Sequence, residues 1–134
     1  MDNKINEYLL LAKKAAKKAY APFSQFHVGC MLVTESGEVF PGCNIENRSF
    51  GLTICAERSA LSAAVTAGKK EFSALYLYTP DAKAPVPPCG ACRQVLSEFV
   101  GPNFPVYYTH DGQTVIKKTM QELLPFDSLH DLKD

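Results

Sequence analysis

Two short cysteine-containing stretches constrain this chain more than any other feature of its sequence. They are Cys55-Ala56-Glu57-Arg58 and Pro87-Pro88-Cys89-Gly90-Ala91-Cys92. Thiolate sulfur is a favoured zinc ligand, and the i, i+3 spacing of Cys89 and Cys92 puts both on one face of a helix's first turn. Cys55 opens a second helix-like run. A shared metal site therefore requires a fold that brings the starts of two helices together.

The chemistry of these stretches is that of a catalytic zinc site. Three thiolates, from Cys55, Cys89 and Cys92, leave one tetrahedral position open, whereas a structural zinc site is closed by four protein ligands. The positive ends of the helix dipoles favour the thiolate form. Glu57 is then placed to take a proton from a zinc-bound water. The stretches predict one zinc ion per chain, with Glu57 as the catalytic acid and base.

Two other interpretations of the cysteines stay open at this level. The Cys89-x-x-Cys92 spacing alone also suits a thiol redox protein. A closed four-thiolate module that binds a partner protein would borrow Cys30 or Cys43 as its fourth ligand. Such a module has no need of a carboxylate at Glu57, which favours the enzyme.

Composition limits the class of protein. A chain of 134 residues that is 46% hydrophobic has the length for one compact domain, spanning 1–134. Its 14 basic and 14 acidic side chains balance, which disfavours a nucleic-acid partner. The sequence has no signal peptide and no run that could span a membrane, so we expect a soluble, cytoplasmic protein with reduced thiols and no membrane partner.

Apolar periodicity and turn residues predict an alternating order of helices and strands. We expect helices at 3–19, 55–67 and 89–101, a last helical turn at 120–124, and strands at 27–34, 38–45, 72–79, 105–110 and 114–118. This order predicts an α/β fold, a three-layer α/β/α sandwich around a mixed five-stranded sheet. The fifth strand should be antiparallel to the fourth. Both cysteine-bearing helices should begin at the same edge of the sheet.

Taken together, the motifs resemble those of a known family. Cys-Ala-Glu followed by Pro-Cys-x-x-Cys is the zinc deaminase signature. With the segments 21–29, 42–47 and 123–125, the chain resembles the small cytidine deaminases over nearly its whole length. The resemblance implies a homotetrameric zinc hydrolase that converts cytidine and deoxycytidine to uridine and deoxyuridine in pyrimidine salvage. A deaminase of another aminopyrimidine nucleoside, such as a nucleoside antibiotic, is the alternative closest to it.

The resemblance also implies a set of substrate-binding residues. Asn44 and Glu46 correspond to the amide and carboxylate that hold the ribose hydroxyls. Phe26 corresponds to an aromatic residue that lies against the pyrimidine ring, and Ala56 belongs to the same binding set. Phe50 stands where the family has a tyrosine, so a contact through that hydroxyl is lost.

Two further residues extend the predicted site. Three thiolates and Zn²⁺ leave an excess negative charge, which a guanidinium at Arg58 would offset by donating hydrogen bonds to sulfur. In the family, an aromatic residue after Leu-Leu-Pro reaches a neighbouring subunit's pocket, and Phe126 is the candidate here. His27, His110 and His130 show no ligand spacing and are predicted to be structural or exposed.

Overall fold

A single five-stranded sheet organises the chain. The computed structural model describes residues 3–132. The sheet has the strand order β2-β1-β3-β4-β5, and only the β3–β4 pair is parallel. The strands are β1 (Gly29–Thr34), β2 (Val39–Cys43), β3 (Phe72–Tyr78), β4 (Pro105–Thr109) and β5 (Val115–Thr119). The predicted mixed sheet, with its fifth strand antiparallel to the fourth, is confirmed.

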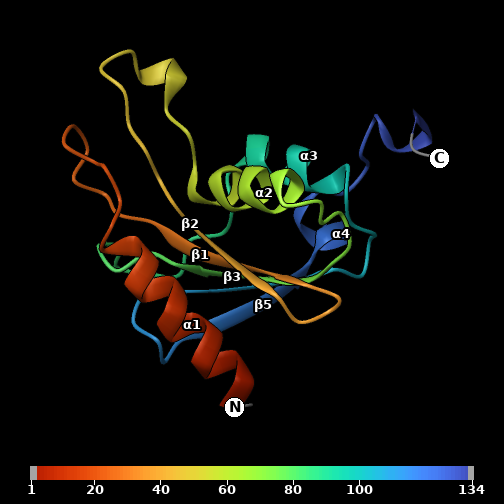
Figure 1. Ribbon diagram of the computed structural model, residues 1–134, viewed down its shortest axis with the longest axis horizontal. Helices are drawn as coiled ribbons and strands as arrows, with labels where there is room; N and C mark the ends of the chain where they lie inside the picture. Colours follow the sequence, from red (N-terminus) through yellow and green to blue (C-terminus); the bar gives the residue numbers. More distant parts are fainter. Residues whose placement is uncertain (1–2, 133–134) are drawn as a thin grey trace.

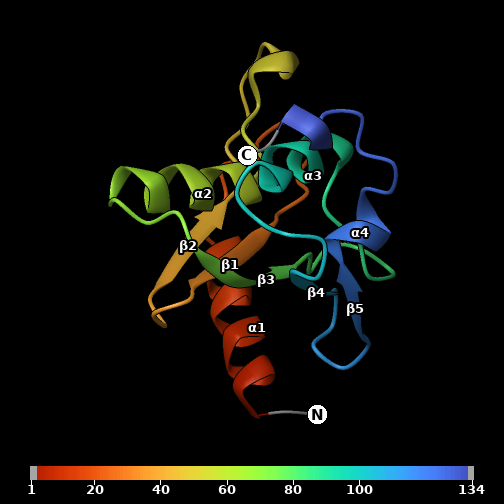
Figure 2. The same ribbon diagram turned by 90° about the vertical axis from the view of Figure 1, so that its right-hand side faces the viewer.

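Helices cover both faces of this sheet and make three layers. Helix α1 lies on one face, and α2, α3 and α4 lie on the other (Figures 1 and 2). The helices are α1 (Asn3–Ala16), α2 (Ala56–Thr66), α3 (Gly90–Ser97) and α4 (Met120–Leu123), with short 3-10 turns at Phe50–Leu52 and His130–Leu132. No helix within residues 3–132 has the length and apolarity needed to cross a membrane.

The alternation of side chains along β1 shows why both faces are covered. Cys30 and Leu32 pack into the core beneath α2 and α3, whereas Met31 and Val33 pack against α1. Successive side chains of a strand point to opposite faces, so a strand that is buried on both faces has a continuous apolar sequence. All six residues of β1 are buried.

Helix α1 is shorter than its pattern predicted. It ends at Ala16 rather than Ala19, and the residues that follow make i→i−3 hydrogen bonds that tighten the last turn. Tyr20 then pairs with the segment after β2, since its N–H donates to Asn44 O at 3.0 Å. This pairing redirects the chain. The buried face of the helix consists of Leu9, Ala12, Ala15 and Ala16.

The two cysteine-bearing helices begin as N-caps rather than as first helical residues. Cys55 caps α2 and Cys89 caps α3, both with extended backbone. Pro88 therefore lies before the cap, outside the helix. Helix α3 ends at Ser97, earlier than the predicted Gly101.

Gly68 follows Ala67, the C-cap residue of α2. It has φ of +86°, and the Lys69 N–H donates to Ala64 O at 2.9 Å. With the Gly68 N–H bonded to Val65 O, also at 2.9 Å, these bonds form a Schellman motif, which favours glycine at the left-handed position.

Candidate active site

The fold brings three cysteine sulfurs from two helices into one cluster. Cys55 and Cys89 cap α2 and α3, and Cys92 lies in the first turn of α3. Their Sγ atoms all lie within 4.8 Å of one another, and the Cys55–Cys89 pair is 3.8 Å apart. Within residues 3–132 this is the only group of three or more such side chains close enough to hold a metal ion.

The surroundings of the cluster favour anionic sulfur. The Cys92 thiol and the Arg58 guanidinium donate to Cys55 and hold the pKa of that thiol well below its usual value. Arg58 Nη2 lies 3.2 Å from Cys55 Sγ. Neither capping cysteine bonds a backbone N–H of its own helix through sulfur. A convergent set of soft donors at two positive helix ends fits a zinc ion.

The remaining two cysteines lie outside the cluster. Cys30 is fully buried and its thiol donates to Ala56 O at 3.2 Å. Cys43 lies at the end of β2, and its Sγ is not within reach of the other three. The described residues therefore offer no fourth thiolate, and the structure gives no support to a closed four-thiolate module.

Glu57 places a carboxyl group beside the cluster in a nearly dry environment. Its side chain lies in the first turn of α2 and is only 4% exposed. Burial raises the pKa of Glu57 to about 7. A carboxyl group that titrates near neutral pH can both accept and donate a proton under physiological conditions, which is the property of a general acid and base.

Glu57, Cys55 and Cys89 line a common cavity of about 210 Å³. Three of the predicted substrate-binding residues, Phe26, Asn44 and Ala56, also line it. The other lining residues were not predicted; they are Val28, Thr53, Leu77, Thr79, Val86 and Pro87.

Two signals in the sequence could have identified some of these additional residues. Thr53 and Pro87 lie two residues before a predicted ligand. Leu77 and Thr79 come at the carboxyl end of a strand with a parallel neighbour, where ligand sites collect in α/β sheets. The Thr79 hydroxyl is buried and has no hydrogen-bond partner in the described part of the chain.

Asn44 and Glu46 both fix the loop that precedes β1. The Asn44 amide donates to Phe26 O at 2.8 Å and accepts from the Val28 N–H at 2.9 Å. The Glu46 carboxylate accepts from the Ser24 hydroxyl and from the backbone N–H groups of Phe23 and Ser24. These bonds, led by that from the Ser24 hydroxyl, lower the pKa of Glu46. Asn44 reaches the cavity, and Glu46 does not line it.

Phe50 lies away from the cavity of its own chain. It begins the 3-10 turn of the loop between β2 and α2, which projects from the body of the molecule (Figure 1). Its side chain is 72% exposed and packs edge-on against Phe23, with ring centroids 5.7 Å apart.

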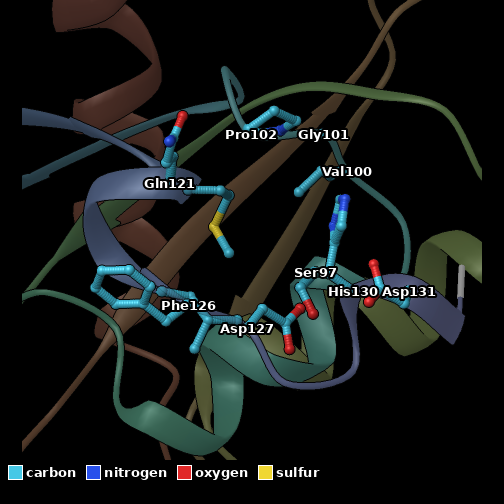
Figure 3. A pocket seen from close by; sticks show the side chains of 11 residues that line it. Ser97, Val100, Gly101, Pro102, Gln121, Phe126, Asp127, His130 and Asp131 are labelled. Atoms are coloured by element: carbon cyan, nitrogen blue, oxygen red, sulfur yellow. The ribbon is translucent and has the colours of Figure 1, made fainter.

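Phe126 lines a separate and larger hollow beside the C-terminal segment. Figure 3 shows this pocket, which has a volume of about 430 Å³ and shares no lining residue with the smaller cavity. Phe126 itself is fully exposed and has φ of +57°. The smaller cavity holds the thiols and the buried carboxyl group, so we assign the chemistry to it.

Comparison with known proteins identifies the family. A sequence model described as "Cytidine and deoxycytidylate deaminase zinc-binding region" matches residues 2–108. The chain belongs to the cytidine and deoxycytidylate deaminase family. This membership and the Cys55, Cys89 and Cys92 cluster agree on one zinc ion per chain.

The similarity to individual deaminases extends over most of the chain. A cytidine deaminase of Sporosarcina psychrophila is 43% identical over 121 residues, which cover 90% of this chain and 88% of the relative. A cytidine deaminase of Halalkalibacterium halodurans is 45% identical over a region that covers 85% of this chain and 86% of the relative. The crystal structure of the Burkholderia pseudomallei cytidine deaminase superposes on this chain with a TM-score of 0.86 at 44% sequence identity. The superposition covers 94% of this chain and 98% of the crystallised one.

Proposed function

We propose that this deaminase hydrolyses cytidine and deoxycytidine to uridine and deoxyuridine with release of ammonia, as a step of pyrimidine salvage in the cytoplasm. The observation that carries the proposal is the buried Glu57 carboxyl group, which shares a small cavity with the sulfur cluster. The relatives named cytidine deaminase support the choice of substrate.

Glu57 performs the proton transfers of this reaction. When bound, the zinc ion supplies the Lewis acid that activates water for attack on C4 of the cytosine ring. Glu57 takes the proton that the water releases and passes a proton to N3 as C4 becomes tetrahedral. It then assists the amino group to leave as ammonia while the C4–N bond breaks. Its near-neutral pKa suits both directions of transfer.

The cavity wall holds the nucleoside. Phe26 packs against the pyrimidine ring, and Ala56 also lines the cavity. Asn44 keeps one further N–H and one further lone pair beyond its two bonds to the loop, and these serve the ribose hydroxyls. Glu46 and Phe50 complete the proposed binding set, although neither lines the cavity of its own chain.

Arg58 compensates the charge of the metal site. Three thiolates carry more charge than a divalent cation neutralises, which opposes ionisation of the water. The guanidinium contact with Cys55 Sγ at 3.2 Å withdraws part of that charge.

A homotetramer completes the site. Apolar side chains on the projecting loop and the tail are exposed in the single chain, including Ile45, Phe50, Leu52 and Phe126. Neighbouring subunits of a closed symmetric assembly would cover such side chains. Phe126 is the residue that we assign to a neighbour's cavity.

Ultraviolet absorbance tests the proposed reaction, because deamination changes the pyrimidine chromophore. The zinc-loaded protein should convert both cytidine and deoxycytidine, and the Glu57→Gln protein should not. Zinc-loaded protein that leaves both nucleosides unchanged would overturn the choice of substrate.

A further inference from the structure

The two walls of the small cavity come from segments that are far apart in the sequence. Phe26 and Val28 form one wall, immediately before β1. Thr79, Val86 and Pro87 form the other, in the loop that connects β3 to the capping residue Cys89. The two segments continue the antiparallel strands β1 and β3, which pair Gly29 with Tyr78. The contacts between them beyond the sheet therefore determine where Phe26 lies in the cavity.

His27 and Asp81 make that contact. Asp81 Oδ2 accepts from the backbone N–H of His27 at 2.7 Å and lies 2.7 Å from its imidazole Nδ1. The bond from the His27 backbone N–H is the main cause that holds the pKa of Asp81 below its usual value, and the bond from the imidazole adds to it. Because a carboxylate only accepts hydrogen bonds, Nδ1 carries the proton in this contact. His27 lies between the two residues that line the first wall.

The segment 26–28 is thereby fixed from two sides by side chains. Asn44 holds it through Phe26 O and the Val28 N–H, at 2.8 and 2.9 Å. Asp81 holds it from the opposite loop. That loop is stiff because residues 80–88 include four prolines.

We infer that Asp81, acting through His27, is a positioning residue that fixes the Phe26 wall against the 80–88 loop and so sets the fit of the cavity to a pyrimidine ring. The inference rests on the proposed function of the cavity. A role in overall stability is the lesser effect, because both side chains are partly exposed, at 37% and 41%, and such pairs add little to folding. A small displacement of a binding wall has a larger effect on a bound ligand.

Binding and turnover of cytidine in variants of the pair test this role. Asp81→Ala should raise KM about tenfold, because a displaced Phe26 loses contact with the pyrimidine ring, while kcat changes by less than about twofold. His27→Ala keeps the backbone N–H that donates to Asp81 and should have a smaller effect. The double variant should be no worse than Asp81→Ala, because the two side chains act as one unit. Asp81→Asn retains an acceptor oxygen and should restore part of the affinity.

A side-chain contact of similar exposure elsewhere serves as the matched control. Lys69 Nζ and Glu38 Oε1 lie 3.0 Å apart, with side chains 38% and 47% exposed, and neither residue lines the cavity. Glu38→Ala should leave KM unchanged. If Asp81→Ala behaves like Glu38→Ala, or lowers kcat and thermal stability without raising KM, the positioning role is overturned.

Calorimetric titration of cytidine in a Glu57→Gln background separates this inference from the proposed function. The Glu57→Gln protein should bind cytidine without turning it over, and addition of Asp81→Ala should raise Kd about tenfold. Equal Kd values in the two proteins would overturn the positioning role alone. Failure of the Glu57→Gln protein to bind cytidine would overturn the proposed function and the inference together.

Discussion

Glu57 is a carboxyl group that the fold keeps almost entirely from solvent, in the first turn of the helix that Cys55 caps. That burial is the main cause of its raised pKa. Two of the three clustered sulfurs, those of Cys55 and Cys89, belong to residues that line the same cavity. Substitution of Glu57 therefore tests proton transfer, and substitution of the cysteines tests metal binding.

Glu57→Gln should retain zinc and fold while losing about 10²- to 10⁴-fold in kcat, the usual contribution of a positioned acid–base group. Glutamine has nearly the same shape but cannot exchange the proton. Elemental analysis measures the zinc content, and absorbance measures the turnover of cytidine. Retention of more than about a tenth of the wild-type kcat would exclude Glu57 from the proton transfers.

The raised pKa of Glu57 should be visible in the stability of the metal-free protein. Burial raises this pKa from its ordinary 4.5 to about 7, so the folded state favours the protonated form. The stabilising contribution of Glu57 is then complete at a pH below its pKa in the unfolded chain. It declines as the pH rises through its pKa in the folded protein.

Relative to Glu57→Gln, the metal-free wild-type protein should lose at most about 1.4 kcal/mol of unfolding free energy per pH unit across this window. Denaturant unfolding of both proteins between about pH 5 and about pH 8 measures the difference. Identical pH dependence in the two proteins would show that the pKa of Glu57 is not raised.

The cysteines should divide into ligands and non-ligands. Cys89→Ser should lose most of the zinc, because it removes one of three clustered sulfurs. Cys43→Ser should keep the zinc, since Cys43 lies outside the cluster. Zinc analysis of both purified variants decides the matter, and loss of metal from Cys43→Ser would require a different ligand set.

At the scale of elements, the close approach of β2 to α2 fixes the first turn of that helix. A Cβ atom added at Gly42 would lie 2.3 Å from Ala56 O and 2.7 Å from Ala60 N. These are backbone atoms of the helix that carries Glu57. Only a residue without a side chain allows the strand and the helix to pack at this distance.

Gly42→Ala should therefore destabilise the protein by about 1–3 kcal/mol, as overpacking typically does, and should lower kcat by displacing the first turn of α2. Gly51→Ala is the matched control, because a Cβ at that position meets no atom within 4 Å. Chemical unfolding and turnover of both variants measure the effects. Equal stability of the two variants would show that α2 adjusts freely.

Element order and the Cys89–Cys92 pair could be predicted from the sequence because both depend on local patterns, whereas the approach of Cys55, 34 positions from Cys89, depends on the fold. Spacing placed Cys89 and Cys92 on one helical turn, and apolar runs located the strands. The start of β1 was harder to predict, because side chains of Asn44 and Asp81 make most of the hydrogen bonds to 26–28, and within the described chain only Val28 O accepts a backbone bond, from Asn44 N at 3.3 Å. Likewise, Glu46 bonds to residues 22 and 23 positions away in the sequence, and periodicity carries no information about such contacts.

At the scale of the whole molecule, the exposed apolar side chains of the projecting loop and the tail are the strongest indication of assembly. Phe126 is fully exposed, and Phe50 and Leu52 are 72% and 66% exposed. Side chains of this size on an isolated surface favour association with a partner. Light scattering at assay concentration should show a tetramer.

Phe126→Ala should raise KM for cytidine while zinc content stays unchanged, because the aromatic ring is assigned to a neighbouring cavity. Leu10→Ala is a suitable control, since Leu10 is also exposed, at 59%, but lies on α1 in the opposite layer. A fully active monomer, or equal KM values in the two variants, would show that each chain has a complete site of its own.

The capping cysteines have a consequence for the life of the protein in a cell. Helices α2 and α3 both start at a cysteine that makes no side-chain capping bond, so neither start has the stabilisation that serine or aspartate provides. A zinc ion held by Cys55, Cys89 and Cys92 would replace that stabilisation and would cross-link the two helices. In chains made during zinc starvation, the first turns of α2 and α3 would be frayed and accessible to proteases. The abundance of the protein would then follow the trace-metal supply of its host.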